Sequence, residues 1–113
     1  MKAKILMAVF AAPLLVSASY SNARLAGGFA QLVELGRDLS PLLSAPLPED
    51  TLAQLKQLEG CKVMHVESLS ARYVGFGIDW KCRRKSKGLK TAAIVKIEDG
   101  KIYEVVMADA SWS

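Results

Sequence analysis

Residues 92–106 have the sequence AAIVKIEDGKIYEVV. Two apolar runs flank Asp99-Gly100, and a two-residue turn of this composition is a strong signal for a β-hairpin. The pairs expected across an uninterrupted ladder are Glu98 with Lys101, Ile97 with Ile102, Lys96 with Tyr103 and Val95 with Glu104. This register gathers aliphatic side chains on one face of the hairpin, and it places Glu104 on that same face.

Residues 73–82 form a second alternating segment that precedes this hairpin. Its apolar positions fall at every second residue, as in a strand with one buried and one open face. They are Val74, Phe76, Ile78, Trp80 and Cys82. With a further strand that begins after Cys61, the sequence predicts a four-stranded antiparallel meander.

Two helical patterns come before the strands. Residues 24–35 carry apolar side chains near helical spacing, and Gly36 ends the pattern. A second helix is expected to begin at Pro48 and its two following acids and to stop at Gly60. The prolines within residues 37–47 predict a connection with at most one helical turn. The expected fold class is therefore α+β, with N-terminal helices packed on a curved sheet.

The N-terminus resembles an export signal. Lys2 and Lys4 precede an apolar stretch over residues 5–16, which is too short to span a bilayer. We expect residues 1–18 to be a signal peptide cleaved after Ala18, with Ser21 and Ala23 as alternative sites, and residues 19–113 to form one domain. The mature protein is expected to be soluble, without a transmembrane segment, and periplasmic or secreted.

Cys61 and Cys82 are the two cysteines of the chain. In an exported protein such a pair favours a disulfide, here closing a loop of roughly 20 residues. His65 is the single histidine, so no ligand set for a metal is completed, and neither a metal nor another cofactor is expected.

The charge of the chain is unevenly distributed. The whole sequence carries a formal charge of +4, yet a block of basic residues without acids falls within residues 81–90. Its members are Lys81, Arg83, Arg84, Lys85, Lys87 and Lys90. Arg83, Arg84, Lys85 and Lys87 are the candidate binding residues for an anionic envelope component or a protein partner. Nucleic acid is not expected, and the alternative is a solvated turn that protects the sheet edge.

A disulfide between neighbouring strands would place Cys61 opposite Cys82. Continuing that register pairs Val63 with Trp80, His65 with Ile78 and Glu67 with Phe76. His65 and Glu67 then join Glu104 on the apolar face, where a carboxylate beside a histidine could perform acid–base chemistry. A one-residue bulge would instead turn His65 and Glu67 outward. A non-enzymatic binding or assembly module is favoured, and a small enzyme that uses these residues is the alternative.

The order helix, helix, four-stranded meander, with Leu55-x-x-Leu58-x-Gly60 before the sheet and Asp99-Gly100-Lys101-Ile102 in the last hairpin, resembles the nuclear transport factor 2-like superfamily. More narrowly, it is similar to small exported cystatin-like or SnoaL-like domains of unknown function. The resemblance implies a curved sheet around a helix, a cone-shaped pocket and a possible homodimer through the sheet.

Overall fold

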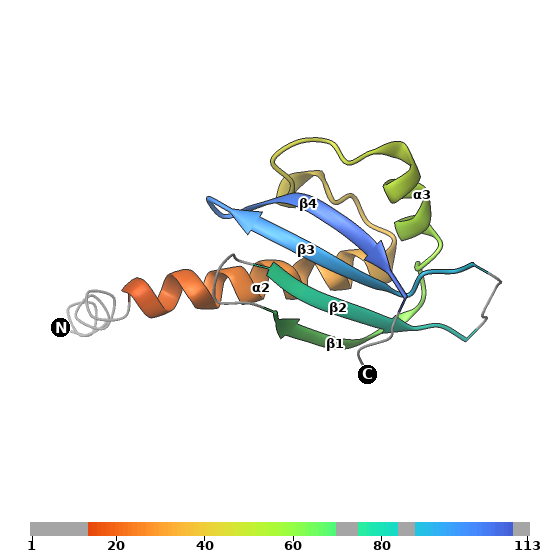
Figure 1. Cartoon of the computed structure of the whole chain (residues 1–113), viewed down its shortest axis with the longest axis horizontal. Coiled ribbons are helices and arrows are strands. Elements are labelled where there is room, and N and C mark those ends of the chain that lie inside the picture. The colour runs from red at the N-terminus through yellow and green to blue at the C-terminus, as the bar shows by residue number, and fades with distance from the viewer. Residues whose placement is uncertain (1–13, 70–74, 84–87, 110–113) are drawn as a thin grey trace.

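The computed structural model describes residues 14–69, 75–83 and 88–109. A four-stranded antiparallel sheet forms one layer, and the helices form a second layer on one of its faces (Figure 1). The elements are α2 (Leu14–Leu35), the 3-10 turn η1 (Ser40–Leu42), α3 (Glu49–Lys56), β1 (Lys62–Ser68), β2 (Gly75–Lys81), β3 (Ala92–Glu98) and β4 (Lys101–Ala108). The strand order β1-β2-β3-β4 confirms the predicted α+β arrangement and its meander.

The helix α2 begins earlier than the sequence pattern indicated. It is continuous from Leu14, through all three expected cleavage positions. From Ser21 onward, where the side chains of α2 are described, the buried ones are Ala26, Phe29, Ala30 and Val33, and the first turns of the helix project beyond the sheet (Figure 1). The described contribution of α2 to the core therefore comes from the part of the helix that follows the expected leader.

The end of α2 has the geometry predicted from Gly36. This glycine adopts a φ of 68°, a left-handed conformation that residues with a Cβ seldom reach. The amide of Arg37 donates to the Leu32 carbonyl at 2.9 Å, and the amide of Gly36 donates to the Val33 carbonyl at 3.1 Å. This pair of hydrogen bonds is a Schellman motif, which satisfies the last carbonyls of the helix and turns the chain away.

The second helix, α3, starts after Pro48 as expected and carries Glu49 and Asp50 in its first turn. It ends at Lys56, before the expected stop, because the chain continues through tighter turns in which the Leu58 amide donates to the Leu55 carbonyl. The segment between the helices contains the single turn η1, which confirms the expected connection. Thus α2 packs against β1 and β2, whereas α3 packs against β4.

The disulfide between Cys61 and Cys82 is present, with Cα atoms 4.4 Å apart. It joins the start of β1 to the end of β2 and belongs to the hydrophobic core. None of the described helices is long and apolar enough to cross a membrane.

Replacing both cysteines, Cys61→Ser with Cys82→Ser, should lower the free energy of unfolding by about 3 kcal/mol, because the unfolded chain regains the entropy of an open loop of roughly 20 residues. Urea unfolding of the oxidised protein, the reduced protein and the double variant tests this expectation. Reduction and substitution should give similar losses. Equal stability of all three proteins would contradict a stabilising role for the disulfide.

Candidate functional site

A β-bulge in β1 decides where the candidate acid–base residues lie. Val63 is opposite Trp80 as predicted, but the ladder then resumes with His65 opposite Asp79 and Glu67 opposite Gly77. Met64 is the extra residue. The predicted pairs of His65 with Ile78 and of Glu67 with Phe76 are therefore wrong, and the alternative with a bulge is the one observed. The side chain of His65 is 70% exposed.

A second bulge, at Tyr103 in β4, has the same effect on Glu104. Ile97 lies opposite Ile102 as expected, and beyond the bulge Lys96 lies opposite Glu104 rather than Tyr103. The Lys96 Nζ and the Glu104 Oε1 are 3.2 Å apart. Val95 therefore pairs with Val105, and the prediction that Glu104 lies on the aliphatic face is wrong.

All three candidate acid–base residues lie on the outer face, by which we mean the face of the sheet turned away from α2 and α3. His65 and Glu67 are on β1 and Glu104 is on β4, which are the two opposite edges of the sheet. The structure thus separates Glu104 from the other two. The closest partner of His65 is Asp79, with the His65 Nδ1 4.0 Å from an Asp79 Oδ1 that accepts no hydrogen bond.

Deleting single residues of β1 tests the bulge. Removing Met64 should cost less than about 1 kcal/mol, because His65 stays opposite Asp79 and the ladder becomes regular. Removing Val66 should cost at least about 2 kcal/mol, because Glu67 would then take the position that faces Ile78 in the core. Urea unfolding compares the two deletions. Equal losses would contradict the register described here.

The described part of the basic block forms an edge at the disulfide end of the sheet. Lys81 is the last residue of β2, and Arg83 follows Cys82 with its side chain exposed. The candidates Arg84, Lys85 and Lys87 lie outside the described residues. The structure adds Lys62, which lies directly opposite Lys81. Sequence reasoning did not single out Lys62, although the register imposed by the two cysteines already placed it there.

We call Lys62, Lys81 and Arg83 the basic end. They line a shallow groove together with Glu34, Gly60, Met64 and Cys82. Glu34 is the one acid in the described lining against three basic residues, and its Oε1 accepts a hydrogen bond from the Val63 amide at 2.9 Å. Like charges directly opposite each other in a sheet are unfavourable. The basic end therefore concentrates positive charge beside a covalent link that fixes its geometry.

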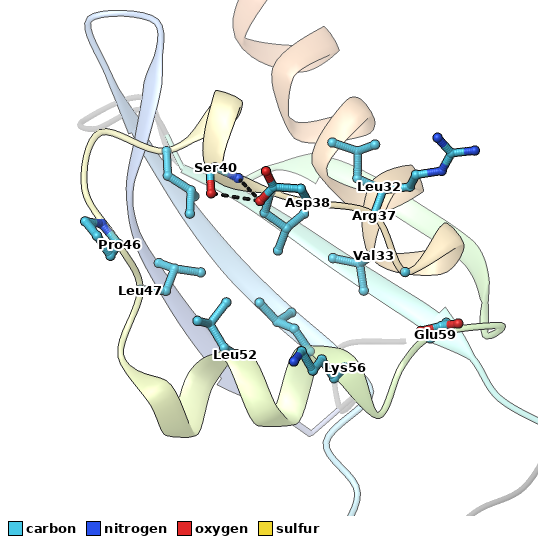
Figure 2. A pocket seen from close by; sticks show the side chains of 14 residues that line it. Leu32, Val33, Arg37, Asp38, Ser40, Pro46, Leu47, Leu52, Lys56 and Glu59 are labelled. Carbon is cyan, nitrogen blue, oxygen red and sulfur yellow. Dashed lines mark hydrogen bonds between the residues drawn. The ribbon is translucent and has the colours of Figure 1, made fainter.

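A cavity of about 520 Å³ lies on the helix side of the molecule. It is formed by the C-terminal half of α2, the segment around η1, and α3, whose side chains converge on it in Figure 2. Its aliphatic lining consists of Leu32, Val33, Leu39, Leu43, Leu47, Leu52 and Leu55. The charged residues of the described lining lie at the periphery of the cavity. They are Arg37, Asp38, Lys56 and Glu59.

Asp38 is held by its own turn. Its Oδ1 accepts hydrogen bonds from the Ser40 amide at 3.1 Å and from the Ser40 hydroxyl at 2.8 Å (Figure 2). The hydrogen bond from the amide, followed by that from the hydroxyl, lowers the pKa of Asp38 below its ordinary value. Asp38 is therefore ionised at neutral pH and committed to the turn that starts η1.

The described residues contain no group of three or more His, Cys, Asp or Glu side chains that could hold a metal ion. No family model, no curated protein and no solved structure matches the chain. The geometry of the basic end and of the cavity is therefore the evidence on which a functional assignment depends.

Proposed function

We propose that this protein is a non-enzymatic binding module of the bacterial envelope that contacts a phosphate-bearing lipid surface through its basic end. The observation that carries the proposal is the direct pairing of Lys62 with Lys81 on adjacent strands. Arg83 follows on the same edge, and the sequence block adds Arg84, Lys85 and Lys87 to the charge in its neighbourhood.

Phosphate groups on the partner would relieve the repulsion within the basic end. The disulfide between Cys61 and Cys82 prevents the two strands from slipping apart to separate Lys62 from Lys81. An anionic membrane surface reduces the repulsion between Lys62 and Lys81. It also adds an attraction of about 1 kcal/mol for each basic residue near it. The interaction weakens as salt rises, because the charges are exposed.

Two features of the chain support a place in the bacterial envelope. The leader-like residues 1–18 and an intramolecular disulfide suit an exported protein that is periplasmic or secreted. Membership of the nuclear transport factor 2-like, cystatin-like superfamily stays a prediction, as does a homodimer through the sheet. Exposed apolar side chains at Met64, Leu69 and Val106 are compatible with such a dimer.

Vesicle binding tests the proposal. The variant Lys62→Gln with Lys81→Gln should reduce affinity for vesicles containing phosphatidylglycerol about tenfold or more, at about 1 kcal/mol for each charge removed. Co-sedimentation at low and at physiological salt measures the change. Vesicles of phosphatidylcholine alone should bind neither protein.

The control is Lys96→Gln with Lys101→Gln, which removes the same charge from the opposite half of the sheet. Because Lys96 pairs with Glu104 and Lys101 donates to the Pro41 carbonyl, circular dichroism first confirms that this variant is folded. At physiological salt it should bind within about twofold of the unchanged protein, because exposed charges beyond a Debye length of about 8 Å contribute little. Equal losses in both variants would show that net charge, not the basic end, governs binding. An absence of vesicle binding together with retention on an acidic protein would assign the basic end to a protein partner.

A further inference from the structure

We infer that the cavity between α2, η1 and α3 is a second binding site, which takes a single-chain amphiphile with an anionic head group. The site is separate from the basic end and does not depend on the function proposed for it. Its volume of about 520 Å³ lies within the range of small-molecule sites, about 300 to 1,000 Å³.

The walls favour an apolar chain over a polar ligand. Leu39 and Leu47 of the segment between the helices and Leu55 of α3 are buried, and the half-buried Leu32 and Leu52 add to the apolar surface. Backbone polar groups near the cavity are used within the protein: the Leu42 amide donates to the Leu39 carbonyl, and the Leu52 amide donates to the Pro48 carbonyl. A hydrocarbon chain that packs against these leucines removes apolar surface from water, so it is the occupant that the walls stabilise.

The charges at the periphery select the head group. Asp38 is committed to Ser40. The Glu59 carboxylate lies beside Gly36, at the end of α2, and is not within ion-pair distance of Lys56. Arg37 turns its guanidinium away from the cavity in Figure 2. Lys56 remains. It lines the cavity from the last turn of α3, and among the described residues it has no carboxylate within ion-pair distance.

The head group therefore belongs on the α3 side. The ionised Asp38 repels an anion at the η1 side, whereas Lys56 attracts one at the end of α3. A carboxylate or a phosphate monoester at the end of a hydrocarbon chain satisfies both conditions. A cationic head group would meet Lys56 with a like charge.

Ligands of equal chain length separate the contribution of the head group from that of the tail. Dodecanoate, dodecyl phosphate, dodecanol and dodecylamine, each below its solubility limit or critical micelle concentration, would compete with the neutral fluorescent probe N-phenyl-1-naphthylamine. We expect the two anions to bind about three- to tenfold more tightly than dodecanol, and dodecylamine to bind most weakly. The variant Leu52→Trp, which fills the cavity, should weaken all four.

The variant Lys56→Gln should bring the anions to the affinity of dodecanol and leave dodecanol unchanged. Lys90→Gln is the control, since it removes the same charge from a residue that does not line the cavity, and the preference for anions should persist. Circular dichroism confirms that each variant is folded. Equal affinity for dodecanoate and dodecylamine, or a preference that survives in Lys56→Gln, would overturn the head-group assignment. If none of the four ligands displaced the probe, or if Leu52→Trp had no effect, the cavity would not be the site.

Discussion

The arrangement of the two layers depends on a buried hydrogen bond between them. The indole Nε1 of Trp80, near the end of the inner strand β2, donates to the Ala30 carbonyl of α2 at 3.1 Å. The described core contains no fully buried polar or charged residue, so this N–H would be unsatisfied if the helix slid or rotated. An unsatisfied buried donor costs about 1 to 3 kcal/mol. The bond therefore fixes α2 against β2, whereas the surrounding apolar contacts would tolerate small shifts.

One turn farther along α2, Glu34 attaches the edge of the sheet. Its carbonyl accepts a hydrogen bond from the Gly60 amide at 2.8 Å, and its carboxylate accepts one from the Val63 amide at 2.9 Å. The second contact protects a backbone group on the free side of β1, where an unpaired amide could recruit another strand. At the other edge, Ile102 in β4 accepts a hydrogen bond from the Ser44 amide. Both edges of the sheet are thus partly covered, β1 by α2 and β4 by the segment between the helices, and Glu34 at the β1 edge also lines the groove of the basic end.

The sequence predicted the elements better than it predicted their register. Asp99-Gly100, the paired cysteines and Gly36 each mark a local geometry that few alternatives satisfy, and all three were predicted correctly. The two bulges were harder, because Met64 and Tyr103 are ordinary strand residues and no glycine marks them. A signal was nevertheless present. Core-facing residues in both edge strands are three positions apart instead of two, Val63 with Val66 and Ile102 with Val105. That odd spacing requires an extra residue in the strand, and it reverses the face of every ionisable residue that follows.

The cavity follows from the way in which the helices divide the sheet, which no local pattern in the sequence encodes. Because α2 lies over β1 and β2 while α3 lies over β4, the connecting segment must bridge the interval between the two helices. It is attached to β4 where the Ser44 amide meets Ile102 and where the Lys101 Nζ donates to the Pro41 carbonyl at 2.7 Å. These hydrogen bonds hold the connecting segment beside β4, so its leucines line the cavity between α2 and α3 without filling it. An apolar surface held open in this way retains hydrophobic energy that an apolar ligand can recover on binding.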